Sequence, residues 1–204
     1  MKTIFDSKFQ KEVVLIGQGE IAVEKSNSRL ISTTLGSCIA VCLFDPESLV
    51  GGMNHYMLPA PALEEECIVF SRAKYGVNSM EYLINELLKI GAVRERITAK
   101  IFGGANMFGQ NSPNTSLTSV GAQNIAFAQS YLTMERISVL AKDVGGDHAR
   151  KIYLDPTTGK VKLFRLRSQQ MDEVLDSEVK YRKKIQSEDK HKDEESVDAK
   201  ITLF

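Results

Sequence analysis

The sequence predicts an α+β fold, a mixed or antiparallel β-sandwich flanked by helices. Three observations predict it. Strand-like segments outnumber helical ones, several follow one another without a helix between them, and a polar turn joins the last two into a hairpin over residues 150–167. The 204 residues are 43% hydrophobic and 25% charged, an ordinary balance for a globular domain with a sizeable core.

The first half of the chain supplies mainly strands. Apolar residues 13–23, interrupted by glycines, predict two short strands or a strand and a turn. Residues 30–45 are rich in β-branched side chains and are divided by Gly36. Within them, residues 39–44 are apolar on both faces, which is typical of a buried strand. Residues 49–58 predict the next strand, which two prolines end.

The second half alternates helices and strands before the hairpin. Apolar residues recur at helical spacing over residues 78–90, where Asn78 is a suitable N-cap. A second helix is predicted over residues 122–135. Strands are predicted over residues 98–102 and 137–144, and each runs into a pair of glycines.

The composition changes near residue 176. Residues 177–204 are about half charged, with both signs present, and contain few apolar side chains. Such a segment buries too little surface to offset the entropy of ordering. We therefore expect one domain over residues 1–176, followed by a charged tail over residues 177–204 that is disordered or partly helical.

The charge balance argues against several classes of protein. Lysine and arginine total 26, as do aspartate and glutamate, and tryptophan is absent, so a nucleic-acid-binding role is not expected. No stretch approaches the roughly 18 apolar residues of a membrane helix, and residues 1–12 lack the apolar segment of a secretory signal, so no membrane insertion is expected. Three cysteines indicate reduced thiols in the cytoplasm.

Cys38 is the candidate nucleophile. It follows Gly36 and Ser37 at the start of the buried strand, where a small-residue loop lets a substrate approach backbone N–H groups. A thiol needs a partner to become nucleophilic at neutral pH, and His55 lies 17 residues later on the next strand. His148 lies in a polar loop and His191 in the charged tail. From pattern alone, a thiol and an imidazole that merely fill the core remain the alternative.

The sequence contains only weak motifs for binding a metal or a phosphate-bearing cofactor. Cys38, Cys42, Cys67 and His55 are conceivable zinc ligands, but one C-x3-C spacing without a second close pair is not typical of a zinc site. The glycines of residues 103–104 are followed by no Lys-Ser or Lys-Thr pair, so a phosphate loop is not expected. The sequence predicts no cofactor and no metal.

Several segments together resemble one known family. LGSCIAVCLFD and GGMNHYMLP carry the candidate cysteine and histidine, and KIFGGANMF and DVGGDHARKIYLDPTTGKV follow in order. They resemble the CheD family, the chemoreceptor glutamine deamidases of bacterial and archaeal chemotaxis, over residues 17–166. The resemblance implies an αβ sandwich related to the cytotoxic necrotizing factor deamidases.

The resemblance also implies a reaction and its residues. Members of the family hydrolyse the side-chain amide of receptor glutamines to glutamate and ammonia through a cysteine thioester. Cys38 would be the nucleophile and His55 its partner, holding it as a thiolate. The third member, usually a threonine six residues before the cysteine, falls on Ser32, while Thr33 and Thr34 next to it leave that role open.

The expected partners follow from the same resemblance. The substrates would be the cytoplasmic domains of methyl-accepting chemoreceptors, and a CheC-type phosphatase is a further expected partner. The alternative function is a non-catalytic chemotaxis adaptor that binds receptors or CheC without turnover.

Overall fold

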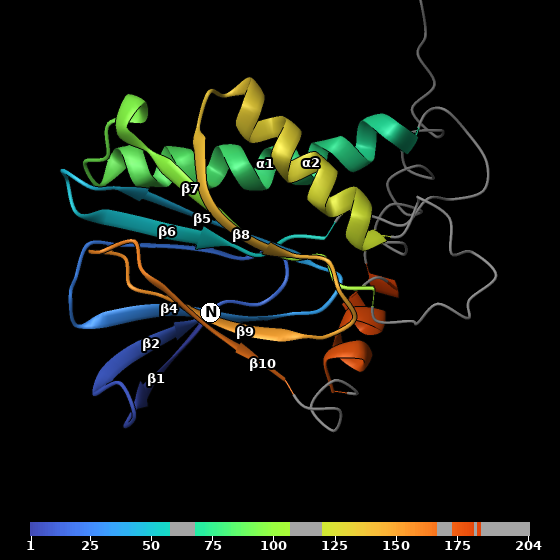
Figure 1. Ribbon diagram of the computed structural model, residues 1–204, viewed down its shortest axis with the longest axis horizontal. Coiled ribbons are helices and arrows are strands. Elements are labelled where there is room, and N and C mark those ends of the chain that lie inside the picture. Colours follow the sequence, from blue (N-terminus) through green and yellow to red (C-terminus); the bar gives the residue numbers. More distant parts are fainter. Residues whose placement is uncertain (58–67, 107–119, 167–172, 182, 185–204) are drawn as a thin grey trace, which may run out of the picture.

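Two five-stranded sheets form the body of the protein. The computed structural model describes residues 1–57, 68–106, 120–166, 173–181 and 183–184 (Figure 1). The first sheet has the strand order β1 (Lys2–Asp6), β2 (Lys11–Leu15), β4 (Arg29–Leu35), β9 (Arg150–Leu154), β10 (Val161–Arg165). The second has the order β3 (Ile21–Glu24), β6 (Val50–Asn54), β5 (Ile39–Asp45), β7 (Thr98–Gly103), β8 (Ser138–Val144).

The molecule has three layers. Helices α1 (Ile68–Lys89) and α2 (Val120–Met134) both lie on the outer face of the second sheet, and the first sheet packs against its inner face (Figure 1). A short 3-10 helix, Arg94–Arg96, precedes β7. One apolar cluster fills the space between helices and sheet, and a second fills the space between the sheets. The predicted α+β sandwich is confirmed, with both long helices on one side.

The chain passes from one sheet to the other through residues 36–38. β4 ends at Leu35 in the first sheet and β5 begins at Ile39 in the second, as the break at Gly36 indicated. β5 and β6 then pair antiparallel, with Cys42 opposite Met53. An isolated bridge between Ile39 and Tyr56 extends this pairing to the end where the chain crosses.

Most predicted elements are present, and two differ. The strands over residues 39–44, 98–102 and 137–144 and the terminal hairpin are found close to their expected bounds. α1 begins at Ile68, ten residues before the expected Asn78, so Asn78 lies inside the helix rather than capping it. β1 was not predicted, and it pairs antiparallel with β2 at the edge of the first sheet.

Residues 173–181 and 183–184 are helical and lie at one end of the sandwich (Figure 1, orange to red). We call them the C-terminal helical segment. The expected domain boundary at residue 176 falls inside it. Val174 and Leu175 pack against Ala105 and Ala149, and Glu178 is 1% exposed. Residues 185–204 of the expected tail lie outside the described residues.

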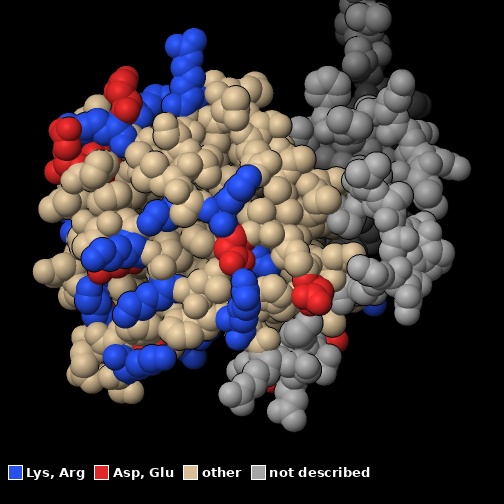
Figure 2. All heavy atoms as spheres, viewed as in Figure 1, with Lys and Arg blue, Asp and Glu red and all other residues tan. Residues whose placement is uncertain are grey.

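The surface carries charges of both signs. On the face drawn in Figure 2, Lys and Arg side chains are spread over the sandwich with Asp and Glu side chains among them. Among the described residues, no helix combines the length and apolar character needed to cross a membrane.

Candidate active site

Cys38 and His55 lie at the end of the β5–β6 pairing where the chain crosses between the sheets. Ile39 and Tyr56 exchange two backbone hydrogen bonds of 3.0 and 2.9 Å, and Cys38 and His55 flank this pair at diagonally opposite positions. Side chains alternate along a strand, so both point to the inner face of the second sheet, and diagonal neighbours lie within reach of a long side chain. Cys38 is 0% and His55 3% exposed. The structure thus brings the two predicted residues to one buried place.

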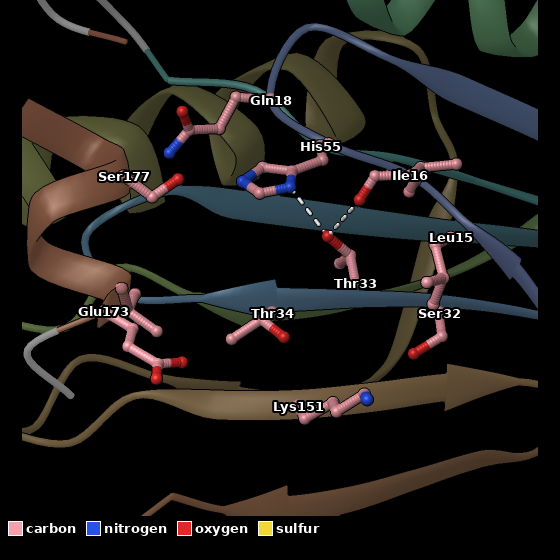
Figure 3. A pocket seen from close by; sticks show the side chains of 12 residues that line it. Leu15, Ile16, Gln18, Ser32, Thr33, Thr34, His55, Lys151, Glu173 and Ser177 are labelled. Atoms are coloured by element: carbon pink, nitrogen blue, oxygen red, sulfur yellow. Dashed lines mark hydrogen bonds between the residues drawn. The ribbon is translucent and has the colours of Figure 1, made fainter. Parts of the chain in front are cut away.

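Thr33 orients the imidazole of His55. Its Oγ1 lies 2.7 Å from His55 Nδ1 and donates to the Ile16 carbonyl at 2.8 Å (Figure 3). A hydroxyl has one proton, and a carbonyl oxygen only accepts, so Thr33 Oγ1 accepts from Nδ1–H. The neutral imidazole therefore carries its lone pair on Nε2, which has no hydrogen-bond partner among the described residues.

Ser32 does not occupy the place that the resemblance assigned to it. Its Oγ is buried and has no hydrogen-bond partner among the described residues, and Thr33 bonds the imidazole instead. Positions 31, 33 and 35 of β4 face the second sheet, since Ile31 and Leu35 belong to the cluster between the sheets. Successive side chains point to opposite faces, so Ser32 points away from His55 (Figure 3). The residue that orients the histidine is therefore Thr33.

Burial sets the charge of His55. Loss of solvation lowers its pKa to about 4, and the Ile16 carbonyl and the more distant Glu20 carboxylate oppose this shift only in part. The imidazole is consequently neutral at physiological pH in this form. A neutral imidazole with its lone pair on Nε2 is in the form that can accept a proton from a thiol.

The loop of residues 36–38 has its carbonyl groups fixed on one side. The Cys38 carbonyl accepts from Gly104 N at 2.7 Å, the Gly36 carbonyl from Ala105 N at 2.8 Å, and the Ser37 carbonyl from Asn124 Nδ2 at 2.8 Å. At Gly103, whose φ is +113°, a Cβ would lie 2.1 Å from the Cys38 carbonyl oxygen, so this close approach requires glycine.

The donors of the same loop converge on one carboxylate. Glu178, from the C-terminal helical segment, accepts from Gly36 N at 3.2 Å and Cys38 N at 3.1 Å through one oxygen. Its other oxygen accepts from Ser37 Oγ at 2.6 Å. Glu178 was not predicted as a site residue, because its segment has the composition of a charged tail. The apolar pair Val174 and Leu175, one turn earlier, is the signal that the helix packs on the domain.

Gln18 is a second residue of the site that was not predicted. Its Nε2 donates to the sulfur of Cys38 at 3.3 Å. The loop that carries it is fixed to His55, since Gly19 N donates to the His55 carbonyl at 2.7 Å and His55 N donates to the Glu20 carbonyl at 3.0 Å. A donor at this distance stabilises negative charge on sulfur.

A pocket of about 350 Å³ opens beside His55 (Figure 3). Its walls come from the loop after β2, from β4 and β9, and from the C-terminal helical segment. The lining residues are Leu15, Ile16, Gly17, Gln18, Ser32, Thr33, Thr34, His55, Lys151, Glu173, Val174 and Ser177. Cys38 is not among them, so in this form the pocket reaches the imidazole but not the thiol.

The remaining candidates play no part in this arrangement. Cys42 is buried between the sheets, and loss of solvation raises the pKa of its thiol far above the ordinary value, a shift that Lys100 opposes only in part. Cys67 and His191 lie outside the described residues. His148 pairs with the exposed Asp147 at 3.1 Å. The described residues contain no group of three or more potential metal ligands.

Comparisons with known proteins agree with the resemblance. A family model described as CheD chemotactic sensory transduction matches residues 57–165. A Shewanella oneidensis protein named "Probable chemoreceptor glutamine deamidase CheD 1" is 38% identical over 90% of this chain and 86% of its own length. Proteins named as probable CheD deamidases are 43% identical in Hahella chejuensis (76% of this chain, 72% of theirs) and 36% in Laribacter hongkongensis (90% and 86%).

A solved Neisseria meningitidis structure aligns with 66% of this chain and 62% of its own at 11% identity and a TM-score of 0.39, too little to bear on the fold. The family model and the relatives carry the assignment without it, since the first matches more than half of the chain and the second are more than 30% identical over most of their own length. The chain belongs to the CheD family.

Proposed function

We propose that this protein is a cysteine-dependent deamidase that converts glutamine side chains of methyl-accepting chemoreceptors to glutamate. The observation that carries the proposal is the placement of Cys38 diagonally across from a buried His55. Thr33 bonds the Nδ1 of this imidazole, which leaves Nε2 without a hydrogen-bond partner among the described residues. The names of the relatives, which describe chemoreceptor glutamine deamidases, support the choice of substrate.

The first half of the reaction forms a thioester. His55 Nε2 accepts the proton of the Cys38 thiol as the sulfur attacks the carbon of the glutamine amide, and the carbonyl oxygen becomes an oxyanion. When the tetrahedral intermediate collapses, the C–N bond breaks and the imidazolium gives its proton to the departing nitrogen. Ammonia leaves, and the substrate remains bound to sulfur as a thioester.

The second half consumes water. Neutral His55 accepts a proton from a water molecule that attacks the thioester carbon, the C–S bond breaks, and the sulfur regains a proton from the imidazolium. The sum is glutamine plus water giving glutamate plus ammonia, with no change in oxidation state. Thr33 keeps Nδ1 protonated through both halves, as the third member of a catalytic triad does.

The loop of residues 36–38 is suited to the oxyanion. Asn124 fixes the Ser37 carbonyl, and because that peptide is planar and trans, the Cys38 N–H points to the opposite side, where it shares one acceptor with the Gly36 N–H. A preorganised donor of this kind contributes about 3 kcal/mol in other enzymes. In the form described here these donors hold Glu178, so substrate binding requires that this contact be released.

Mass spectrometry of a receptor cytoplasmic fragment tests the proposal. The wild-type protein should convert defined glutamines to glutamate, and Cys38→Ala and His55→Ala should abolish the conversion because each removes a reacting group. Cys42→Ala, which changes a buried thiol outside the site, is the matched control and should retain activity. Receptor binding without any Gln-to-Glu conversion by the wild-type protein would instead identify a non-catalytic adaptor.

The compartment and the second partner are part of the same proposal. Chemoreceptor cytoplasmic domains are accessible only from the cytoplasm, so we place the protein there. Binding of a CheC-type phosphatase stays a prediction, and co-purification of the two proteins would test it.

A further inference from the structure

We propose that Glu178 is an intramolecular mimic of the reaction product, which closes the active site by occupying the binding site that the loop of residues 36–38 offers to the substrate's carbonyl group. This inference rests on the proposed function for the meaning of the site. It adds an occupant and a regulatory state that the deamidase reaction does not require.

The contacts of Glu178 with residues 36–38 have the form of an anion-binding site. Three donors from three consecutive residues, Gly36 N, Ser37 Oγ and Cys38 N, all end on one carboxylate that lies about 140 residues away in the sequence. The carboxylate is 1% exposed, and both of its oxygens are used. Buried backbone donors are almost always satisfied, so without Glu178 these donors need another acceptor.

The chemistry of the occupant matches the chemistry of the product. Deamidation of glutamine yields a glutamate side chain, and Glu178 presents that group to the backbone N–H of the nucleophile itself. The N–H of a nucleophilic cysteine is a usual donor to the oxyanion of an acyl-transfer intermediate. One position cannot hold both oxygens, so the contact of Glu178 and the binding of substrate exclude each other.

The charge of Glu178 also opposes the reaction. The ion pairs among the described residues include none with Glu178, so its carboxylate is held by neutral donors alone. A carboxylate beside Cys38 disfavours the thiolate through repulsion of like charges. The closed form therefore blocks the donors and also weakens the nucleophile.

Access to Cys38 depends on the same C-terminal helical segment. Cys38 is 0% exposed and does not line the pocket beside His55, whereas Glu173, Val174 and Ser177 of the C-terminal helical segment form one of its walls (Figure 3). Withdrawal of the segment would remove this wall and the carboxylate together. A receptor glutamine could then reach the thiol from the pocket.

Alkylation of Cys38 by iodoacetamide tests the closure without any receptor. The full-length wild-type protein and the Glu178→Ala variant are treated in parallel, and the rate at Cys38 is read by peptide mapping, which separates it from Cys42 and Cys67. We expect Glu178→Ala to react at least about tenfold faster, the factor that corresponds to about 1.4 kcal/mol. Asp176→Ala, which removes an exposed carboxylate from the same segment, should react like the wild type.

Glu178→Gln provides a second variant that keeps the shape of the side chain. It should also alkylate faster than the wild type, by a smaller factor, because the amide forms weaker hydrogen bonds than the carboxylate. Equal alkylation rates for the wild type and a folded Glu178 variant would overturn the proposal, whichever of the two variants folds.

Receptor deamidation separates this inference from the proposed function. If Glu178→Ala alkylates faster and also converts receptor glutamine faster, both stand. If alkylation accelerates but no form deamidates receptors, the closure stands and the proposed function fails. If the wild type deamidates receptors and loss of Glu178 accelerates neither alkylation nor turnover, the closure alone is wrong.

Discussion

Each end of strand β5 holds a buried carboxylate, and the two are bound in different ways. Asp45, at the end of the strand, is 0% exposed and accepts from Val93 N at 2.8 Å and from Arg96 Nη2 at 2.9 Å. Burial by itself raises the pKa of Asp45, but these contacts and the Glu47 and Ser48 amides outweigh it and hold the pKa well below its usual range. At the other end, the residues that precede β5 bind Glu178, and all of its donors among the described residues are neutral.

The difference separates a structural contact from an exchangeable one. Asp45 is the last residue of β5 and accepts from the amides of the turn that follows, and its guanidinium partner compensates the buried charge. Glu178 comes from a distant segment and fills donors that a substrate can also use. We expect the first carboxylate to govern stability and the second to govern activity, and the following predictions test that division.

The largest expected effect is on stability at the Asp45 end. Asp45→Ala leaves the Arg96 guanidinium and the Val93, Glu47 and Ser48 amides without their acceptor. The free energy of unfolding, measured in urea, should fall by about 3 kcal/mol, the lower part of the range for a broken buried pair because Arg96 is 30% exposed. Glu47→Ala, which removes the exposed partner of Arg96, should cost less than about 1 kcal/mol.

The next effect is a pH dependence at the Cys38 end. The pKa of His55 is lowered from 6.5 to about 4 by burial, so below pH 6.5 the unfolded chain binds a proton that the folded chain does not. The free energy of unfolding should therefore decrease as the pH falls through this window, by about 2 kcal/mol from pH 7 to pH 5. His55→Gln should remove this part of the decrease, and identical pH profiles would show that the imidazole is not buried in its neutral form.

A smaller effect concerns the two neighbouring hydroxyl groups of β4. Thr33→Val keeps the shape of the side chain but removes the acceptor of His55 Nδ1–H, so the tautomer is no longer fixed. Receptor deamidation should fall about tenfold, or about 1.4 kcal/mol in transition-state stabilisation. Ser32→Ala should leave the rate within about twofold, because Ser32 points to the other face of the sheet. If Ser32→Ala lowered the deamidation rate more than Thr33→Val, Ser32 rather than Thr33 would be the residue that orients the imidazole.

The smallest expected effect is the stability change at Glu178. Removal of this carboxylate breaks three hydrogen bonds but also relieves a buried charge without a counter-ion among the described ion pairs. Glu178→Ala should change the free energy of unfolding by less than about 1 kcal/mol, in contrast to Asp45→Ala. A loss as large as that of Asp45→Ala would make Glu178 a structural residue and remove the distinction between the two ends.

The sequence predicted the part of the site that local pattern determines. The glycine break before a buried strand and the strand after it placed Cys38 and His55 on neighbouring segments, and the structure has them on one face of one hairpin. The orienting hydroxyl was assigned to Ser32 by counting from the cysteine. Counting cannot show which face of β4 points to the second sheet, and that face carries Thr33.

The parts that the sequence did not predict depend on distant packing. Glu178 lies in a segment whose composition is typical of a solvated tail, and only its contact with residues 36–38 gives it a role. β1 has four exposed residues of five, so it lacks the apolar alternation that marks a strand. In α1, Asn78 is a signal of a helix start, but the helix already begins at Ile68 and runs through it.

Because the chain crosses between the sheets, the proposed catalytic residues come from both sheets. Thr33 belongs to β4 in one sheet, while Cys38 and His55 lie next to the Ile39–Tyr56 bridge that extends the β5–β6 pairing of the other. Neither sheet alone contains Thr33, Cys38 and His55 together. The hydrogen bond from His55 to Thr33 can form only once the two sheets have docked. A chain whose two sheets have not docked would therefore lack the hydrogen bond that fixes the imidazole, so the proposed hydrolytic chemistry would depend on the complete sandwich.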